Sequence, residues 1–584
     1  MSLEIKSEGV EGVGEAALRP RDLLVAGVLM AALAGVRLWR LDASCLWFDE
    51  VFSVHAARHG WRALVDFVAL DLIHPPLFYL SLKGWIGLVG SEAAWWVRVF
   101  AVLTATAACV PVMLLCRELG LRPRVGHVAL GLMAASGFLI QHGREVRMYS
   151  LLLLLAACSL WLFARYTWGA RGRKRVGLGA PVSLFVVNLL LVYTHYYGWL
   201  LVGHELIFLA VWGRERLKEF AAMSVALAVC YSPWLWMVWE ASGEGEGLEQ
   251  NIGWAIAPRV AEIVQPFLLL HEPFRFRQNT HERAVLRVNV WLALAVFVPA
   301  FVALGWRVVG RRRAGAGKLE TTNGEMRDEG RDADVTFALK FLIFFSTAPV
   351  VAAFLLARVL PHSVWGVRHL IIIAPVYLLL AAYALYALRP LWLATTIRLL
   401  LGCWLALAAM LWLVRRAEVP PVWCAWETLA RRVVETETTA GAGEAATGEG
   451  GTGREVKIYA TEELVAYHLW YALSPAGSAR SADAGRFRVA AIANLPGLSE
   501  DRAFFLPRGF AEVSRADAGA EEHGGEGALR EEHFWAAFRD TSWNAGHPLL
   551  RLLSERGYEI EKRFELTASG QKAFIVSARR RRER

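Results

Sequence analysis

Long apolar runs alternate with short polar stretches over roughly the first 414 residues, and about eleven of the runs are long enough to cross a bilayer as helices. The runs lie near residues 22–38, 98–116, 126–141, 149–165, 181–195, 198–213, 220–239, 286–306, 337–357, 369–388 and 391–414. They predict an all-α polytopic membrane domain over residues 22–414, preceded by a cytoplasmic tail at residues 1–21. The first run lacks a small-residue cleavage site and is therefore interpreted as a signal anchor.

The basic loops between the runs set the predicted orientation. Lys and Arg gather in the loops at residues 117–124, 165–175, 214–218 and 307–318, and such loops stay on the cytoplasmic side. The loops at residues 40–97, 142–148, 194–198, 240–285 and 358–368 then face outward. The apolar segment 77–90 is only about 14 residues long and is interpreted as a membrane-surface or re-entrant helix, because a true span there would invert every later loop.

The chain changes character after residue 414. Residues 435–455 are rich in Gly, Ala, Thr and Glu, which is typical of a flexible linker or an inserted loop. The runs VKIYA, RFRVAAIANL, YEIEKRFEL and KAFIVSARR read as strands, and TEELVAYHLWYAL reads as an amphipathic helix. We therefore expect a small extracytoplasmic α/β domain within residues 415–584, to which the sequence assigns no chemistry.

Composition agrees with this division. The chain is 56% hydrophobic with a mean hydropathy of +0.36, whereas soluble domains are about 45–50% apolar. The net charge of +9 is dispersed over the loops, so membrane topology explains it better than a nucleic-acid-binding groove does. Among the seven cysteines, Cys45 and Cys424 both fall on the outward side of this topology, which allows a disulfide between them.

The first outward loop carries the richest candidate chemistry. Asp49 and Glu50 lie in LWFDEVF, and His74 follows in DLIHPPLFYL. An acidic pair beside a bilayer is unfavourable unless it is solvated or used, and a carboxylate there suits the removal of a proton from an acceptor. The alternative is an ordinary acidic residue at a helix start.

Further polar groups lie at the ends of later spans on the same predicted face. They are Arg98, Glu145, Arg147, Tyr149, His195, Arg368 and His369. Arginine pairs with phosphate in a fork geometry, although arginines and aromatic residues at span ends also serve as interfacial anchors. Each residue alone is weak evidence, but their concentration on one face is not explained by solubility.

Taken in order, these stretches resemble the GT-C superfamily of membrane glycosyltransferases. The matching elements are WFDE, HPPLFYL, a G-x-E…R pattern, REVRMYSL, YTHYYG and VRHLIIIAPVYLLL. They extend over about residues 20–390. The chain looks most like glycosyltransferase family 39 and its bacterial relatives, the aminoarabinose transferases and protein O-mannosyltransferases.

The resemblance implies a polyprenyl-phosphate sugar donor, usually undecaprenyl phosphate in bacteria, and an active site on the extracytoplasmic face of the inner (plasma) membrane. It implies a hexosyl- or pentosyltransferase acting on a glycolipid such as lipopolysaccharide, on another cell-envelope polysaccharide, or on a protein. A transporter or flippase of lipid-linked sugars is the main alternative, and it would show charges within the spans and repeat symmetry. A non-catalytic scaffold would leave the acidic pair and the arginines unexplained.

The resemblance also assigns roles to residues. Asp49 corresponds to the catalytic base, with Glu50 beside it, and His74 would shape the acceptor side. Arg147, Tyr149 and Arg368 would bind the donor phosphate or line the site, with Arg98, Glu145, His195 and His369 as further substrate-binding candidates. The family motif often has Arg-Tyr where this chain has Arg368-His369. Asp49, Glu50 and His74 together offer ligands for a divalent metal ion, which members of this branch need not use.

Overall fold

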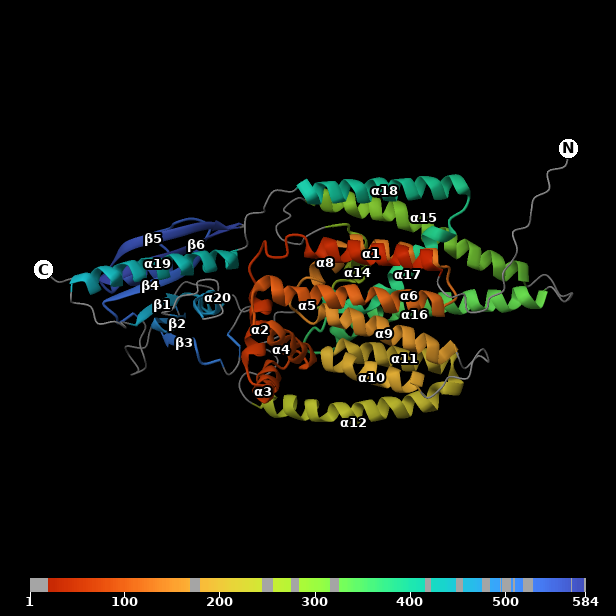
Figure 1. Ribbon diagram of the computed structural model, residues 1–584, viewed down its shortest axis with the longest axis horizontal. Helices are drawn as coiled ribbons and strands as arrows, with labels where there is room; N and C mark the ends of the chain where they lie inside the picture. Colours follow the sequence, from red (N-terminus) through yellow and green to blue (C-terminus); the bar gives the residue numbers. More distant parts are fainter. Residues whose placement is uncertain are drawn as a thin grey trace.

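The computed structural model describes residues 19–168, 179–243, 256–274, 283–315, 325–414, 422–447, 455–474, 484–493, 495, 506–507, 510–517, 529–568 and 570–581. Figure 1 shows a long bundle of roughly parallel and antiparallel helices, with a smaller unit of helices and strands at one end. The two predicted regions of the chain are therefore both observed.

The bundle is built from helices separated by short connections. They are α1 (Pro20–Leu38), α5 (Ala94–Ala107), α6 (Cys109–Glu118), α7 (Pro123–Ala135), α8 (Gly137–His142), α9 (Tyr149–Trp168), α10 (Gly179–Thr194), α11 (Tyr197–Trp212), α12 (Leu217–Ser242), α14 (Gln265–His271), α15 (Arg283–Gly315), α16 (Glu325–Val359), the 3₁₀ segment η4 (Val367–Ile373), α17 (Ala374–Ala387) and α18 (Leu391–Val414). The large outer helices α12, α15 and α18 expose tryptophans, such as Trp306 at 80% and Trp291 at 70%. Such an apolar outer surface is what contact with lipid requires.

Seven segments within the described ranges are long and apolar enough to cross a membrane. They are Ala94–Glu118, Tyr149–Thr167, Arg214–Ser242, Arg287–Arg307, Val335–Val359, Val367–Ala387 and Leu391–Val414. The other four predicted spans are helical too: α1 contains charged residues, and the remaining ones, α7 with α8, α10 and α11, are shorter helices. The chain is thus a multi-pass membrane protein.

The first predicted outward loop is itself helical. It forms α2 (Phe48–Arg58), α3 (Trp61–Asp71) and α4 (Leu77–Val89), which lie together at the end of the bundle nearest the smaller unit (Figure 1). The helix α4 has 13 residues, too few for an untilted span. It ends at Gly90, whose φ of +67° is a left-handed conformation that glycine adopts without strain.

The smaller unit is the predicted α/β domain. Its strands are β1 (Val456–Ala460), β2 (Phe487–Ala493), β3 (Ser514–Asp517), β4 (His533–Asp540), β5 (Tyr558–Ala568) and β6 (Gln571–Arg580), in the sheet order β3-β2-β1-β4-β6-β5. The first four strands pair in parallel, whereas β6 pairs antiparallel with β4 and β5. Helices α19 (Val422–Thr447) and α20 (Glu463–Leu473) pack on one face, and α21 (Pro548–Glu555) packs on the other.

The predicted linker is in part a helix. The helix α19 continues to Thr447, so residues 435–447 are helical, while residues 448–454 lie outside the described residues. The prediction of a linker gave weight to Gly and Thr, whereas Ala and Glu in the same segment favour a helix. The helix is also held by packing, because Trp426 and Val433 are buried and Glu437 accepts a hydrogen bond of 2.8 Å from the indole of Trp535.

Candidate active site

Asp49 lies in the first turn of α2, between two arginines from distant parts of the chain. Its Oδ2 is 3.8 Å from Nε of Arg147, which precedes α9, and 3.6 Å from Nη1 of Arg368, in η4. The Asp49 side chain is 20% exposed, and among the described residues nothing hydrogen-bonds to its carboxylate oxygens. The carboxylate therefore faces two cations and has lone pairs available to accept a proton.

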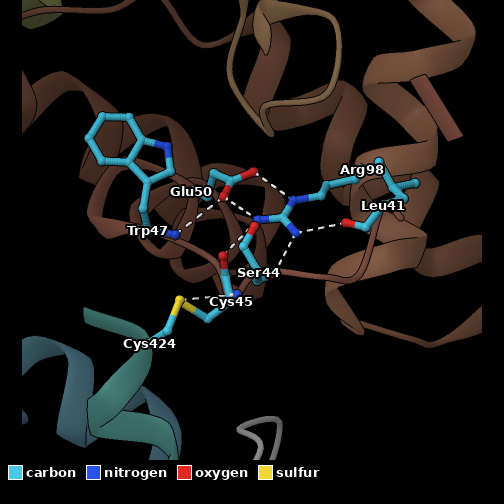
Figure 2. Close-up of a disulfide and its surroundings, with 7 residues drawn as sticks. All are labelled: Leu41, Ser44, Cys45, Trp47, Glu50, Arg98 and Cys424. Atoms are coloured by element: carbon cyan, nitrogen blue, oxygen red, sulfur yellow. Dashed lines mark hydrogen bonds and ion pairs between the residues drawn. A yellow bond between two sulfur atoms is a disulfide. The ribbon is translucent and has the colours of Figure 1, made fainter. Parts of the chain in front are cut away.

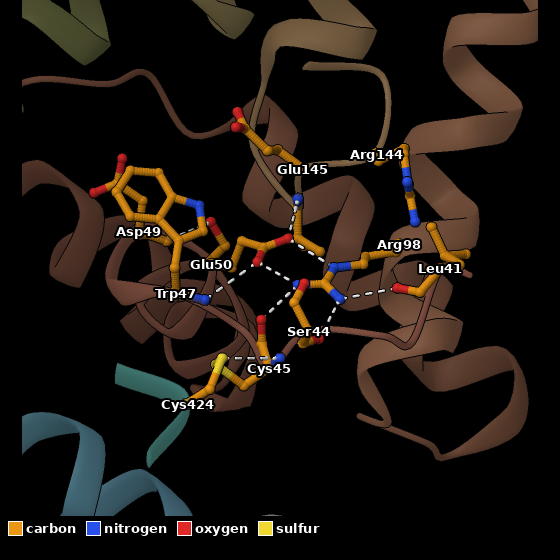
Figure 3. A network of polar contacts seen from close by, with 12 residues as sticks. Leu41, Ser44, Cys45, Trp47, Asp49, Glu50, Arg98, Arg144, Glu145 and Cys424 are labelled. Carbon is orange, nitrogen blue, oxygen red and sulfur yellow. Dashed lines mark hydrogen bonds and ion pairs between the residues drawn. A yellow bond between two sulfur atoms is a disulfide. The ribbon is translucent and has the colours of Figure 1, made fainter. Parts of the chain in front are cut away.

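Glu50, its neighbour, has a different environment. Its Oε1 accepts hydrogen bonds from Nε of Arg98 (3.1 Å) and from the backbone N–H of Val146 (3.0 Å). Its Oε2 accepts from Nη2 of Arg98 (2.7 Å) and from the backbone N–H of Trp47 (3.2 Å), which closes a capping box at the start of α2 (Figure 3). Each oxygen thus receives two donors, and the side chain is only 2% exposed. Glu50 thus differs from Asp49 in having all its acceptor positions occupied, and its catalytic role stays a prediction.

Arg98 completes this buried framework. Besides the two bonds to Glu50, its Nη1 donates to the carbonyls of Leu41 and Ser44 and its Nη2 donates to the carbonyl of Cys45, at 2.7–2.9 Å (Figure 2). All five N–H donors of the guanidinium are therefore used within the protein. The side chain has no donor left for a ligand in this arrangement, and the substrate-binding role of Arg98 stays a prediction.

A disulfide joins this framework to the C-terminal domain. Cys45, whose carbonyl accepts from Arg98, is bonded to Cys424 in the first turn of α19 (Figure 2). The pairing that the topology allowed is thus present. The bond fixes the start of the C-terminal domain four residues before Asp49 in the sequence.

Arg147 is positioned by several partners. Its Nη1 donates to the carbonyl of Asp49 and to the hydroxyl of Tyr79, and its Nη2 donates to Nε2 of His74, each at 3.3 Å. Burial lowers the pKa of Arg147, but Tyr79 and Asp49 raise it by more, so its pKa is raised overall and the guanidinium stays charged. Its Nε is buried without a hydrogen-bond partner among the described residues.

His74 holds Arg147 in place. Its Nδ1 lies 3.1 Å from Oδ2 of Asp71, and its Nε2 accepts from Arg147. Burial, reinforced by the charge of Arg147, holds the pKa of His74 well below its usual value, so the ring is neutral and carries its proton on Nδ1. Because both ring nitrogens are engaged, His74 orients Arg147, and its predicted place on the acceptor side remains a proposal.

The remaining predicted residues surround Arg368. Its guanidinium lies over the ring of Tyr149, 5.6 Å from the centroid. The ring of Tyr149 stacks with that of His369, which in turn lies 4.7 Å from that of His195. The Tyr149 hydroxyl and Nε2 of His195 are buried without partners among the described residues, and within the same residues the guanidinium of Arg368 makes no hydrogen bond.

Glu145 lies beside this group. It accepts hydrogen bonds from Nδ1 of His142 (2.8 Å) and Nε2 of Gln141 (3.0 Å). Burial raises the pKa of Glu145, but His142, Gln141 and Arg368 lower it by more, so its pKa is lowered overall and it stays ionised. Gln141, His142, Asp71 and Tyr79 also support the site, and none of them is among the residues predicted from the sequence. Tyr79 nevertheless belongs to the HPPLFYL motif, and Asp71 lies three residues before His74.

The metal site suggested by the sequence is not formed. Within the described residues no group of three or more His, Cys, Asp or Glu side chains is arranged to hold a metal ion. Glu50 is saturated by its partners, and both nitrogens of His74 are engaged. Asp49, Glu50 and His74 therefore do not fit a divalent cation.

Solved structures share this architecture. Apo ArnT from Cupriavidus metallidurans superimposes with a TM-score of 0.52 at 13% identity, over 95% of this chain and 97% of that one. The protein has the GT-C fold. AglB from Archaeoglobus fulgidus matches at a TM-score of 0.42 and 13% identity, over 79% of this chain and 64% of that one. The yeast (S. cerevisiae) Pmt1–Pmt2 complex matches at 0.30 and 14% identity, over 38% and 33%.

No protein-family model and no curated protein matches the sequence. The resemblance found in the sequence motifs is confirmed at the level of the GT-C fold, and at 13% identity the likeness establishes the fold alone.

Proposed function

We propose that this GT-C protein is a membrane glycosyltransferase that moves a sugar from a polyprenyl-phosphate donor to an acceptor on the extracytoplasmic face. One observation carries the proposal: Asp49, a carboxylate with free lone pairs, lies in a group of residues with three donors that have no hydrogen-bond acceptor within the described part of the chain. The donors are the Arg368 guanidinium, the Tyr149 hydroxyl and Nε of Arg147. Such a set matches one proton to be taken up and one phosphate to be bound.

These groups can accept the proton and stabilise the negative charge that the proposed reaction produces. An acceptor hydroxyl or amine attacks the anomeric carbon, and its proton goes to Asp49 as the new bond forms. The bond between the anomeric carbon and the phosphate oxygen breaks, and the polyprenyl phosphate leaves with one additional negative charge. Arg368 and Arg147 face that charge, and because they are in place before the reaction, they stabilise the transition state without reorganising.

The donor contact falls chiefly to Arg368. Its guanidinium carries no hydrogen bond among the described residues and is 29% exposed, whereas Arg147 already donates to Asp49, Tyr79 and His74. An arginine with a free fork can bind two phosphate oxygens at once. Arg147 then contributes its charge and its unpartnered Nε.

Two features support the proposed face of the membrane. In the predicted topology the basic loops lie at the ends of the spans opposite Asp49, and such loops stay on the cytoplasmic side. The disulfide between Cys45 and Cys424 lies beside the site, and disulfides persist in oxidising compartments. Both features support an extracytoplasmic site in the inner (plasma) membrane.

The purified protein in liposomes, supplied with radiolabelled polyprenyl-phosphate sugars and an extract of envelope lipids, polysaccharide and protein, tests the proposal. Glycosyl transfer predicts that label moves from the donor lipid to an acceptor and that polyprenyl phosphate is released in equal amount. Movement of intact donor between the leaflets, without cleavage, would support a flippase instead. Neither cleavage nor transfer with any donor would overturn the proposal.

A further inference from the structure

The C-terminal domain contacts the helix that carries Asp49. Figure 1 shows α20 next to α2 at the junction of the two units, and the two helices are in contact. Tyr467 of α20 is fully buried, and its hydroxyl lies 3.0 Å from Nδ1 of His55, in hydrogen-bond contact. Its ring meets that of Phe48 edge-on at 5.4 Å. Phe48 directly precedes Asp49, so Tyr467 contacts the first turn of α2 as well as its middle.

The far end of α2 is held by the same helix. The guanidinium of Arg58 lies over the rings of Trp470 and Tyr471, 5.7 and 5.0 Å from their centroids. It also donates to Oγ of Ser474 (3.3 Å) and, through Nε, to Glu92 (2.9 Å). Together with the disulfide at Cys45, these contacts join the C-terminal domain to α2 at three places: just before its start, along its length and at its end.

The helix α2 depends on such contacts for its position. It has 11 residues, and an isolated helix of that length is marginal in water. Asp49 is useful as a base only if its carboxylate stays within about 3 Å of the acceptor proton, and a displacement of about 1 Å can lower the rate by about a hundredfold. Within the bundle, α2 contacts α3 and α4 and is joined to Arg98 of α5 through Glu50. The helix α20 contacts a different part of α2, which includes His55 and Arg58.

We propose that the C-terminal domain is a clamp that holds α2, and with it Asp49, in the reactive position, and that Tyr467 is its central positioning residue. The proposal has a mechanical part, that the domain holds α2 in place, and a catalytic part, that this positions Asp49 for the reaction. Only the catalytic part rests on the function proposed above. His55 provides the neutral partner that the clamp requires, because burial, assisted by the charges of His59 and Arg58, lowers the pKa of His55 to about 3.

The mechanical part is tested by hydrogen exchange of α2 amides in the full-length protein. Tyr467→Phe removes the hydroxyl but keeps the ring, and we expect faster exchange over Phe48–Arg58. The matched control is Tyr459→Phe, which removes a 2.8 Å hydrogen bond to Glu531 inside the same domain, away from α2. If exchange in α2 is equal in both variants and in the wild type, the clamp is refuted whatever the function of the chain.

The catalytic part is tested by steady-state transfer. Tyr467→Phe should lower kcat by about 3- to 10-fold with little change in KM for the donor, the size expected for one lost neutral hydrogen bond, while Tyr459→Phe should leave both unchanged. In the Asp49→Asn background the Tyr467 substitution should have no further effect, because it acts through that carboxylate. An additive effect there, or a change in KM alone, would contradict positioning. Absence of transfer in the wild type would instead refute the proposed function.

A second, independent feature lies among the membrane-spanning helices. Ser159 of α9, Asn188 of α10 and Glu205 of α11 are all buried and contact one another. Oγ of Ser159 is 2.7 Å from Oδ1 of Asn188 and 2.6 Å from Oε1 of Glu205. The amide Nδ2 of Asn188 donates to Oε2 of Glu205 at 2.8 Å, which closes a ring of three contacts.

The number of hydrogens available for these three contacts indicates whether Glu205 is protonated. The Ser159 hydroxyl has one hydrogen and faces two oxygen atoms. If Glu205 were ionised, one of these two short contacts would join oxygens with no proton between them. If Glu205 is protonated, it donates to Ser159, Ser159 donates to Asn188, and Asn188 donates back to Glu205. Every donor then has one acceptor, and no net charge is buried among the helices.

We infer that Glu205 is kept as a neutral carboxylic acid whose proton closes a hydrogen-bonded lock between α9, α10 and α11. The lock connects elements of the site, since α9 begins at Tyr149 and α11 begins two residues after His195. Glutamine is the isosteric replacement for a protonated glutamate, because its amide donates to Ser159 and its carbonyl accepts from Asn188.

Infrared difference spectroscopy of wild type against Glu205→Gln tests this directly. The wild type should show the carbonyl stretch of a protonated carboxylic acid that the variant lacks, and Glu205→Gln should melt close to the wild type, whereas Glu205→Ala melts lower. A carboxylate band lost in Glu205→Gln, with no acid carbonyl band, would overturn the inference. The spectrum reads the protonation state even if Glu205→Ala fails to fold.

Discussion

Replacing Arg368 by lysine tests whether a guanidinium fork binds the donor phosphate. Two charge-assisted hydrogen bonds are each worth about 1.5–3 kcal/mol. Lysine keeps the charge and one contact but cannot reproduce the second. One lost contact therefore weakens donor binding by about 10- to 100-fold, because about 1.4 kcal/mol corresponds to a factor of ten. Arg368 is 29% exposed, so solvent screening favours the lower end, about 10-fold.

The assay is the Kd for a polyprenyl-phosphate sugar, together with its KM in transfer. The matched control is Arg358→Lys, because Arg358 lies at the end of the candidate span Val335–Val359 but contacts Phe354 and the carbonyl of Pro258 instead of Asp49. Arg358→Lys should leave donor affinity unchanged. Wild-type affinity in Arg368→Lys would show that the residue merely anchors a span end and would remove it from the site.

Three further outcomes follow from the described contacts. Glu50→Gln should lower stability by about 3–5 kcal/mol, because it leaves the buried cation of Arg98 unpaired; a thermal unfolding temperature equal to that of the wild type would contradict this framework role. Serine at Cys45 and Cys424 should loosen the C-terminal domain, seen as faster proteolysis of α19, while intact resistance would show that noncovalent contacts suffice. Burial lowers the pKa of both His55 and His468 to about 3. The unfolded chain therefore binds more protons than the folded one below about pH 6.5, and stability should fall as the pH drops from there toward 3, by up to about 1.4 kcal/mol per pH unit for each histidine. A flat dependence in thermal melts over this range would contradict the burial of these rings.

The sequence predicts the membrane bundle well because length and continuous hydrophobicity dominate that choice. It predicts the C-terminal domain less completely. The strand β4, HFWAAFRD, lies near the centre of the sheet but has no β-branched residue and no alternation of apolar and polar positions, so burial between neighbouring strands decides its conformation. The helix α19 was not predicted from the sequence for a similar reason. Its packing depends on residues far away in the sequence, such as Trp535.

The site, too, is predicted only in part from the sequence. Topology alone predicts that Asp49, Arg147 and Arg368 share one face, and the structure brings a nitrogen of each arginine within 4 Å of the Asp49 carboxylate. Topology cannot distinguish the roles of the neighbouring acids Asp49 and Glu50. Successive residues of a helix point about 100° apart, so the two side chains have different surroundings. Only the position of Arg98, 48 residues away in the chain, makes Glu50 a framework residue and leaves Asp49 as the free carboxylate.

The central claim is that Asp49 accepts the proton of the acceptor, and the transfer rate of Asp49→Asn measures it most directly. Asparagine keeps the shape of the side chain but is not a base, so transfer should fall by about 10²- to 10⁴-fold. Donor binding and expression should remain, and Asp66→Asn in the neighbouring helix α3 should retain full activity. Retention of more than about a tenth of the wild-type rate by Asp49→Asn would contradict the account, because general-base catalysis is worth more than that.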